Sequence, residues 1–404
     1  MDDGRMSEAF GGPLYVMSKP VGSRCNLRCD YCYYLEKGKL YAHCRKMEMS
    51  EALLERYVRE LIWAQRGTDV LFEWHGGEPL LRGRAFFEQA LHWQKVYGGG
   101  KRVMNTLQTN GTLLTDDWCR FFRDHGFLLG VSIDGPQWMH DAYRRSADGR
   151  GSWDRVMAGI EKLNRWGVEW NAMAVVNELT THHPLEFYGF FKEIGAKFIQ
   201  FTPNTLKALS IEHLALSIKA DAVETQEQNA GAENNAQCQK IQPRSWGTFL
   251  CRLFDEWVKE DVGEYFIQLF DATLSNWCGL TPGVCSLAKR CGHAACMEFN
   301  GDVYSCDHFV YPDFKLGNLW EHSLTELMYS ERQRQFGLQK ELGLPAQCRR
   351  CRWLFACHGE CPKNRFAVSV DGEPGLNYLC EGYRMFFEHV APWMEWKALQ
   401  IMRN

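Results

Sequence analysis

The grouping of the cysteines constrains this chain more than any other feature of its sequence. The chain has 404 residues and 17 cysteines, and most of the cysteines fall into three clusters, at residues 25–32, 285–306 and 348–380. In a reducing compartment, thiols rarely persist as disulfides and are kept for metals or catalysis. The N-terminal segment MDDGRMSEAFGG has no apolar core of signal-peptide length, so we expect a cytoplasmic chain. Clustered cysteines in such a chain are expected to bind metal.

The overall composition argues against two classes of partner. The chain has 46 lysine and arginine residues against 50 aspartate and glutamate residues, which gives a formal net charge of -4. This balance provides no bulk electrostatic attraction to nucleic acid or to an anionic membrane. No stretch approaches the roughly 18 apolar residues that a membrane-spanning helix needs. We therefore expect no nucleic acid and no membrane among its partners.

Between residue 14 and about residue 260, short apolar runs alternate with longer segments of helical period. This alternation is typical of βα units that build a mainly parallel sheet. Six strands are expected, at Leu14–Ser18, Val70–His75, Val103–Gln108, Leu128–Ile133, Trp170–Val176 and Lys197–Thr202. The loops after parallel strands carry the ligand-binding residues of such folds. Cys25 and the segments HGGEP, QTNG and SIDGP follow the first four strands, so chemistry is expected there.

The rest of the chain divides by composition and cysteine density. Residues 1–206 are expected to form the main α/β domain. Residues 207–245 are rich in Ala, Gln, Asn and Glu and are expected to be a polar insertion. Connecting helices follow at 246–284, and the region 285–385 has too few periodic runs to fold without metal. A C-terminal helix is expected at 386–404.

The first cysteine cluster supplies three thiolates from one loop. Cys25, Cys29 and Cys32 have the spacing C-x3-C-x2-C, with no fourth cysteine at similar spacing. A 4Fe-4S cluster needs four ligands, so three thiolates leave one iron open to a small molecule. The alternative is a structural zinc site with Cys44 or His43 as its fourth ligand.

This motif, its position after a first strand and the HGGEP segment resemble the radical S-adenosylmethionine (SAM) superfamily. The resemblance implies an α/β fold, a partial (β/α)6 barrel, in which SAM chelates the open iron of the first cluster. It also implies a set of SAM contacts: Tyr31 near the adenine, Gly76 and Gly77 near the methionine amino group with Glu78 shaping the turn, Ser132 and Asp134 near the ribose, Arg144 near the carboxylate, and Thr205 through its backbone. For Tyr31 the alternative is ordinary packing, and for Arg144 it is a solvated surface arginine.

The C-terminal cysteines form two further groups, C-x5-C-x14-C and C-x2-C-x5-C-x3-C followed by one more cysteine. The second group resembles the signature of the SPASM domain, which carries two auxiliary 4Fe-4S clusters. The resemblance implies one cluster held by Cys285, Cys291, Cys306 and Cys361, and another held by Cys348, Cys351, Cys357 and Cys380. Cys278 and Cys296 are left over, and either would be a replacement ligand. Two zinc-ribbon sites are the alternative.

Two segments, VYSCDHFVYPDFKLGN and CRWLFACHGECPKNR, resemble the anaerobic sulfatase-maturating enzymes among SPASM proteins. That family converts a Cys or Ser of a sulfatase to Cα-formylglycine without oxygen. The resemblance makes Asp307, directly after a cluster cysteine, the general base; without the resemblance, the alternative is a structural acid of the loop. We expect a raised pKa for Asp307 from burial beside an anionic cluster. This sequence departs from the family at His75, where Gln is common, and in the long insertion after Thr205.

The resemblance therefore implies an oxidoreductase with three 4Fe-4S clusters and SAM. Its partners would be a sulfatase polypeptide with a C/S-x-P-x-R motif and an electron donor such as flavodoxin or ferredoxin. One alternative is another SPASM-type maturase that forms thioether or carbon–carbon crosslinks in a ribosomal peptide. A second alternative is a zinc-dependent scaffold protein.

Overall fold

The computed structural model describes residues 14–205 and 240–403, and these divide into two compact units. The first unit comprises the described residues of Met1–Ile133, His140–Asn171 and Arg290–Gln339. The second unit comprises those of Asp134–Met139, Ala172–Lys289 and Lys340–Asn404. Most of the expected insertion at 207–245 lies outside the described residues. The first unit combines the N-terminal βα segments with a stretch of the cysteine-rich region.

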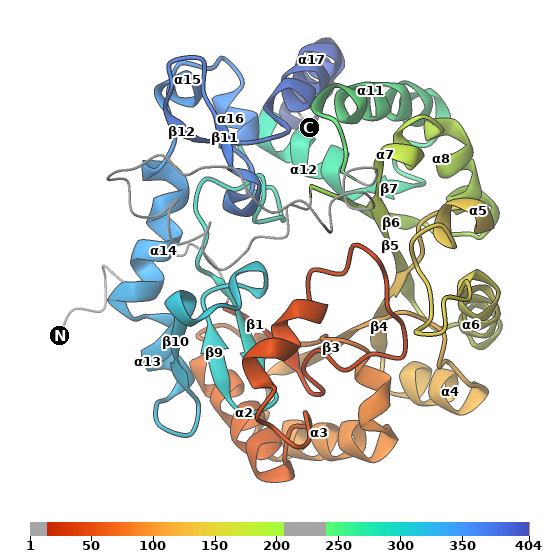
Figure 1. The fold of residues 1–404 in the computed structure, drawn as a ribbon, viewed down its shortest axis with the longest axis vertical. Helices are drawn as coiled ribbons and strands as arrows, with labels where there is room; N and C mark the ends of the chain where they lie inside the picture. The colour runs from red at the N-terminus through yellow and green to blue at the C-terminus, as the bar shows by residue number, and fades with distance from the viewer. Residues whose placement is uncertain (1–13, 206–239, 404) are drawn as a thin grey trace. The chain divides into compact units, whose positions relative to one another are not determined.

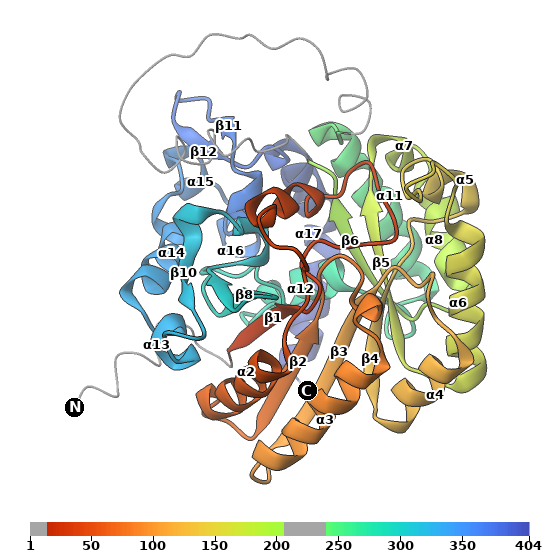
Figure 2. The same ribbon diagram turned by 60° about the horizontal axis from the view of Figure 1, so that its bottom comes forward.

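The first unit is built on a sheet with the strand order β10-β9-β8-β1-β2-β3-β4 (Figures 1 and 2). Strands β1 (Tyr15–Lys19), β2 (Asp69–Trp74), β3 (Arg102–Thr109) and β4 (Phe127–Ser132) run parallel to one another. On the other side of β1, β8 (Ala294–Glu298) also pairs in parallel, and β9 (Asp302–Tyr304) and β10 (Lys315–Asn318) continue the sheet in antiparallel pairs. The chain after β9 is thereby brought to the neighbourhood of β1.

Amphipathic helices cover this sheet because each presents an apolar face to it. They are α2 (Glu51–Ala64), α3 (Arg84–Tyr97), α4 (Asp116–Asp124) and α6 (Trp153–Trp166). Ser50 and Thr115 cap the N-termini of α2 and α4 by accepting backbone N–H groups. Trp74, at the end of β2, is buried against Tyr57 of α2 and against Phe86 and Phe87 of α3. Helices α2 and α3 lie side by side in Figure 2.

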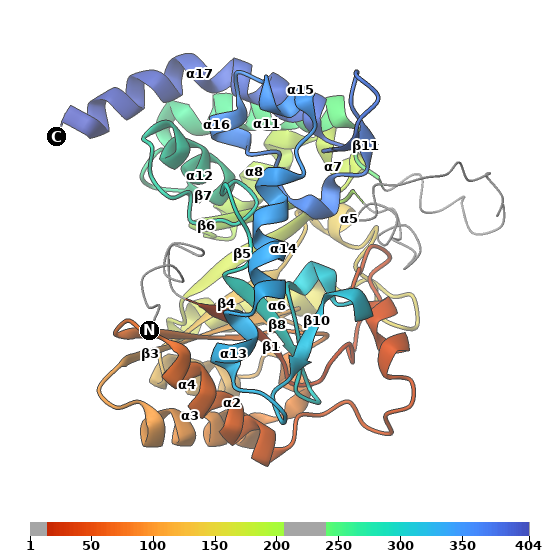
Figure 3. The same ribbon diagram turned by 90° about the vertical axis from the view of Figure 1, so that its left-hand side faces the viewer.

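The second unit contains the parallel strands β5 (Trp170–Val176), β6 (Phe198–Pro203) and β7 (Phe266–Ile267). Its helices are α7 (Glu178–Thr181), α8 (Pro184–Glu193), α11 (Pro243–Glu260), α12 (Gln268–Trp277), α15 (Ala346–Arg349), α16 (Leu354–Cys357) and α17 (Cys380–Arg403). Helices α11 and α17 lie side by side (Figures 1 and 3). Gly247 and Gly382 permit this contact, since a Cβ added to Gly247 would lie 2.8 Å from the Cα of Gly382.

The six expected strands are confirmed to within one residue at either end. The cysteine-rich region 285–385 was expected to fold separately around metal. In the structure it contributes β8, β9 and β10 to the first unit's sheet. The C-terminal helix begins at Cys380, six residues before the expected start at 386. Among the described residues, no helix has the length and apolar character to cross a bilayer.

Candidate functional site

The loop after β1 carries Cys25, Cys29 and Cys32 at one end of the first unit's sheet. The backbone N–H of Cys32 donates to the carbonyl of Cys29 at 3.1 Å, which closes a tight turn between these two cysteines. The sulfur of Cys25 accepts the backbone N–H of Leu27 at 3.4 Å and the side-chain amide of Asn110 at 3.6 Å. Donors aimed at a sulfur favour its thiolate form. Burial raises the pKa of the Cys25 thiol to about 11, so metal binding there must displace a proton.

The HGGEP segment after β2 holds the cysteine loop after β1 in place by backbone hydrogen bonds. Gly77 donates its N–H to the carbonyl of Gly22 at 2.8 Å, and Glu78 donates to that of Arg24 at 2.9 Å. A Cβ on Gly77 would lie only 2.0 Å from the carbonyl oxygen of Arg24, next to Cys25. A Cβ on Gly76, where φ is +122°, would lie 2.8 Å from the Gly22 oxygen. Both glycines are therefore required by the close approach of two backbones.

Glu78 joins the end of β2 to the end of β3. Its fully buried carboxylate accepts the backbone N–H groups of Leu80 at 3.0 Å and Asn110 at 2.8 Å, and also the hydroxyl of Thr109 at 3.0 Å. Burial raises the pKa of Glu78 to about 7, although these hydrogen bonds oppose the shift. Asn110 in turn donates to both Cys25 and Asn26. The sequence placed Asn110 at a strand end but did not single it out, and its fixed position after β3 is the signal that could have done so.

Tyr31 and Arg144 lie on the other side of the same loop. The backbone N–H of Asp30 donates to the carbonyl of Tyr143 at 3.0 Å, and that of Arg28 donates to the carbonyl of Arg145 at 2.7 Å. The Arg144 guanidinium lies 5.4 Å from the centre of the Tyr31 ring. Both side chains are buried, so the alternative of a solvated surface arginine is wrong.

The remaining three candidate SAM contacts have protein partners of their own. Ser132, at the end of β4, accepts a hydrogen bond from Gln108 at 2.9 Å. In the second unit, the buried carboxylate of Asp134 accepts the backbone N–H of Val175 at 2.8 Å. Thr205, also in that unit, donates its hydroxyl to Asn364 at 2.7 Å. These bonds fix the side chains of Asp134 and Thr205, and the proposed SAM contacts of all three residues remain predictions.

Asp307 lies in a polar group with the buried Lys19 and the partly buried Tyr33 and His75, all in the first unit. The ammonium of Lys19, which has no exposed side-chain surface, forms an ion pair with one carboxylate oxygen of Asp307. Tyr33 donates its hydroxyl to the other oxygen. Lys19 also contacts Nδ1 of His75 at 3.2 Å. Lys19 was not identified from the sequence, because no local pattern at the end of a strand indicates an ion pair with Asp307.

The pKa of Asp307 is lowered in this structure, whereas the sequence led us to expect a raised pKa beside a bound anionic cluster. Burial alone would raise the pKa of the carboxyl, but the positive groups around it, first among them the Lys19 ammonium, together outweigh burial and hold the pKa well below its ordinary value. Asp307 is consequently ionised at neutral pH. A carboxylate in this state can accept a proton without first losing one.

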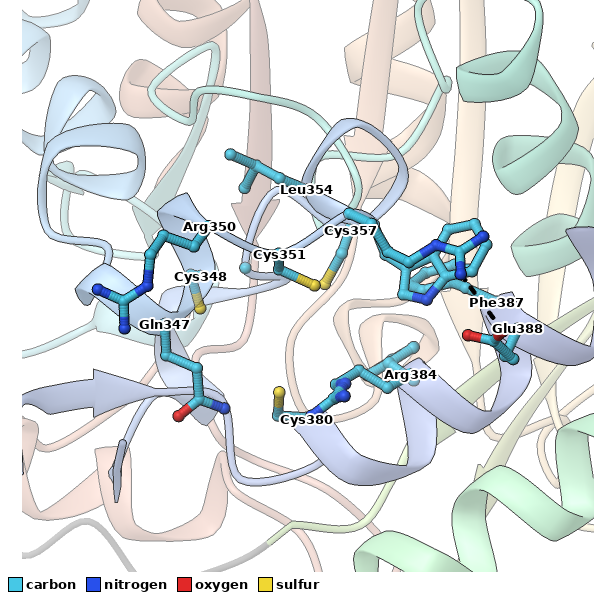
Figure 4. A pocket seen from close by; sticks show the side chains of 14 residues that line it. Gln347, Cys348, Arg350, Cys351, Leu354, Cys357, Cys380, Arg384, Phe387 and Glu388 are labelled. Carbon is cyan, nitrogen blue, oxygen red and sulfur yellow. Dashed lines mark hydrogen bonds and ion pairs between the residues drawn. The ribbon is translucent and has the colours of Figure 1, made fainter. Parts of the chain in front are cut away.

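Four cysteines of the second unit surround one cavity of about 400 Å³ (Figure 4). They come from the segment 348–357 and from the first residue of α17, and they are Cys348, Cys351, Cys357 and Cys380. Their sulfurs point into the same space in Figure 4. The structure thus brings together the complete ligand set that the resemblance to the SPASM domain implies for one auxiliary cluster.

The ligand set assigned to the other auxiliary cluster divides evenly between the units. In the first unit, the buried side chain of Gln333 donates to the carbonyls of Gly292 at 2.9 Å and Ser305 at 3.1 Å, which are the neighbours of Cys291 and Cys306. Cys285 and Cys361 belong to the second unit.

Arg365 orders the loop between Cys357 and Cys361. Its guanidinium donates to the carbonyls of Gly359 at 2.9 Å, His358 at 2.8 Å and Glu360 at 3.1 Å. His358 and Glu360 both have positive φ, which is strained for residues with a Cβ. Arg365 therefore holds a strained turn that sets the positions of two cysteines.

Comparisons with known proteins agree with this geometry. Residues 20–191 match the model of the radical SAM superfamily, and residues 289–352 match that of the SPASM iron–sulfur cluster-binding domain. A serine-type anaerobic sulfatase-maturating enzyme of Bacteroides thetaiotaomicron is 54% identical over 98% of this chain and 94% of that protein. A cysteine-type enzyme of Clostridium novyi is 32% identical over 93% of this chain and 94% of that protein.

This chain belongs to the anaerobic sulfatase-maturating enzymes. A solved structure described as native anSMEcpe with bound AdoMet and Cp18Cys peptide matches 96% of the chain, and 100% of that protein, with a TM-score of 0.81 at 28% identity. The fold is accordingly a radical SAM α/β barrel followed by a SPASM domain. Membership of this family excludes the alternative zinc sites, because the enzyme uses iron–sulfur clusters and SAM.

The residues present suit these cofactors. The cavity bounded by four thiols matches the all-cysteine ligand set of a 4Fe-4S cluster. The loop after β1 offers three cysteines with hydrogen-bond donors directed at Cys25. Three thiolates suit a cluster whose fourth iron binds a small molecule.

Proposed function

We propose that this enzyme oxidises a serine in a sulfatase polypeptide to Cα-formylglycine, in the cytoplasm, where thiols stay reduced. The choice of serine is supported by the 54% identity to a serine-type relative, against 32% to a cysteine-type relative. The target motif is S-x-P-x-R, with C-x-P-x-R as a second substrate. A small redox protein, flavodoxin or ferredoxin, supplies the electron.

The observation that carries this proposal is the position of the Asp307 carboxylate, which directly follows Cys306 and is held by Lys19 and Tyr33. Oxidation of a serine to an aldehyde removes one hydrogen from Cβ, one proton from the hydroxyl and one further electron. When bound, SAM and the first cluster supply a 5′-deoxyadenosyl radical for the Cβ hydrogen, and an auxiliary cluster supplies an electron acceptor. Asp307 accepts the hydroxyl proton, while Lys19 and Tyr33 fix its two oxygens.

The binding residues follow the same assignment. Cys25, Cys29 and Cys32 hold the first cluster. One auxiliary cluster is held by Cys348, Cys351, Cys357 and Cys380, and the other by Cys285, Cys291, Cys306 and Cys361. The contacts to SAM come from Tyr31, Gly76, Gly77, Glu78, Ser132, Asp134, Arg144 and Thr205. We place the domains at 1–206 for the barrel, 207–245 for the insertion, 246–284 for the connecting helices, 285–385 for the SPASM domain and 386–404 for the rest of the C-terminal helix, which begins at Cys380.

The decisive experiment is an anaerobic incubation of reconstituted enzyme with SAM, a reductant and a short peptide that carries S-x-P-x-R. Mass spectrometry should find a loss of two hydrogens from the serine peptide. A peptide with alanine at the target position is the control and should be unchanged. SAM cleavage without any change in the mass of the serine and cysteine peptides would refute the proposal. A crosslinked peptide product would indicate a maturase of the other kind.

A further inference from the structure

His75 occupies the position before GGEP where glutamine is common in the family, and its imidazole has an unusual set of contacts. The backbone N–H of Gly76 donates to Nδ1 at 2.7 Å. The ammonium of Lys19 lies 3.2 Å from the same nitrogen. Both groups are donors, and the Gly76 N–H and the Lys19 ammonium cannot act as acceptors. Nδ1 therefore carries no proton.

The state of the second ring nitrogen follows from the first. Burial and the neighbouring Lys19 ammonium lower the pKa of His75 to about 3, so the ring is neutral. A neutral imidazole without a proton on Nδ1 has it on Nε2, which is then a hydrogen-bond donor. Among the described residues, no group forms a hydrogen bond with Nε2. This atom is also not fully enclosed by protein, because it is not one of the buried polar atoms without a partner. The donor therefore remains available to a ligand.

The location of the imidazole connects His75 with the proposed base. Lys19 contacts His75 and pairs with Asp307 through the same ammonium. The imidazole and the carboxylate thus flank one fixed charge, on the end of β1 that carries the cluster loop. A substrate hydroxyl that reached both Nε2 of His75 and the carboxylate would accept from Nε2–H and donate to Asp307.

We propose that Nε2–H of His75 donates a hydrogen bond to the Oγ of the target serine, which orients the hydroxyl proton toward Asp307 and favours serine over cysteine. The inference rests on the proposed function. An alcohol oxygen is a good acceptor, whereas sulfur is a weak one. An alcohol is also far harder to deprotonate than a thiol, whose ordinary pKa is about 8.5. A donor that stabilises the developing negative charge on oxygen therefore matters more for serine than for cysteine.

Two substitutions at His75 separate this role from a structural one. Asn in His75→Asn can place an oxygen near the Nδ1 position and accept from Gly76, but it has no atom at the Nε2 position. Gln in His75→Gln reaches the Nε2 position with an amide donor. Substitution of the exposed His125 by Asn is the matched control. Iron content, expected at about twelve per chain for three 4Fe-4S clusters, checks that each variant is assembled.

The measurement is kcat/KM of each variant on paired peptides that differ only in Ser or Cys at the target position. For His75→Asn we expect a loss of about 100-fold on the serine peptide, the scale of removing one oxyanion donor, and a much smaller loss on the cysteine peptide. His75→Gln should recover most of the serine activity, and His125→Asn should change neither rate. Equal losses on both peptides, or no loss on serine, would overturn the inference.

Peptide binding gives a second readout that does not depend on turnover. Without reductant, the SAM-loaded enzyme should bind the serine peptide about two- to tenfold more tightly than the matched alanine peptide, as one hydrogen bond provides. His75→Asn should abolish this preference, and its persistence would contradict the proposed contact.

Failure of the two proposals is distinguishable. If the unsubstituted enzyme forms no formylglycine from either peptide, the proposed function fails. If it forms formylglycine but the His75 variants lose serine and cysteine activity alike, only the inference about His75 fails.

Discussion

A lysine with no exposed surface is tolerated when a charged partner lies beside it, and Lys19 has Asp307. The pair connects β1 with the segment that follows β9, and it keeps the proposed base ionised. Tyr33 holds the second oxygen of the carboxylate, so the base has little freedom to rotate. Orientation of this kind contributes to catalysis because the acceptor is in place before the substrate proton arrives.

Replacement of Asp307 by Asn should remove the proton acceptor. We expect formylglycine formation to fall by about 100- to 10,000-fold, the usual contribution of a general base. SAM cleavage should continue, because electron transfer to SAM does not require this carboxylate. The ratio of formylglycine to 5′-deoxyadenosine, measured by chromatography and mass spectrometry, reports the difference.

The loss must be separated from instability, since breaking a buried ion pair costs about 3–5 kcal/mol. The variant Tyr33→Phe helps to separate loss of the base from loss of stability. It removes the hydrogen bond to one oxygen of Asp307 and leaves the Lys19 ion pair in place. Asp313→Asn, at an exposed acid six residues further on, is the control. A product ratio for Asp307→Asn equal to that of the unsubstituted enzyme would refute the role of Asp307.

The buried carboxyl of Glu298 is expected to make the free energy of unfolding depend on pH. This buried acid accepts from Tyr34, and its other oxygen has no partner among the described residues. Burial raises its pKa from 4.5 to about 7. The folded protein therefore holds this proton more tightly than the unfolded chain, so the stabilisation is complete below about pH 4.5 and is lost as the pH rises through 7. The difference corresponds to about 3 kcal/mol.

The variant Glu298→Gln should weaken this dependence. Between about pH 5 and 8, the midpoint of thermal unfolding of the anaerobically reconstituted enzyme should fall less steeply in the variant than in the unsubstituted enzyme. The slope should decrease but not vanish, because burial also raises the pKa of Glu78 to about 7. Parallel curves for the two proteins would show that Glu298 does not titrate in this range.

At the scale of elements, the contact between HGGEP and the cluster loop is the most sensitive junction. Gly77→Ala would place a Cβ 2.0 Å from the Arg24 oxygen, so the loop carrying Cys25 must move. We expect loss of the first cluster, which is about four irons per chain, and of its SAM-dependent change in the electron paramagnetic resonance spectrum. Gly67→Ala is the control, because nothing lies within 4 Å of its added Cβ. A full iron content and an unaltered spectrum in Gly77→Ala would contradict this account.

Local patterns explain which elements could be predicted. Strands β1 to β6 were predictable because each is an apolar run bounded by turn residues. Strand β8 has the sequence AACME, which carries little of the β-branched and aromatic character typical of strands. It forms because its partner is β1, almost 280 residues earlier in sequence, and no local pattern encodes that pairing. Lys19 and Asp307 meet through the same long-range pairing, so no local pattern predicted their ion pair. The auxiliary ligand sets, in contrast, were implied by the resemblance to the SPASM family.

At the scale of the whole molecule, metal binding substitutes for part of an apolar core. In the second unit, the segment 348–357 consists mainly of turns and one-turn helices, and the cavity among its cysteines opens onto α17. Helix α17 continues from that cavity to pack along α11 and α12. A cluster bound there would therefore fix the start of α17 relative to the cysteine loops, and cluster assembly would be coupled to folding of this unit.

The variant Cys380→Ser tests this coupling. It removes one thiolate from the cavity while leaving a side chain of similar size, so about four of about twelve irons should be lost. Without the cluster, the first turn of α17 loses its anchor, and backbone amides in α17 and α11 should exchange hydrogen faster. Strands β1 to β4, which belong to the first unit, should keep their protection. Cys119→Ser, at a buried cysteine of α4 outside every proposed ligand set, is the control and should keep all of the iron. If Cys380→Ser loses the iron but α17 stays fully protected, packing against α11 alone holds the helix, and the cluster is there for electron transfer and not for folding.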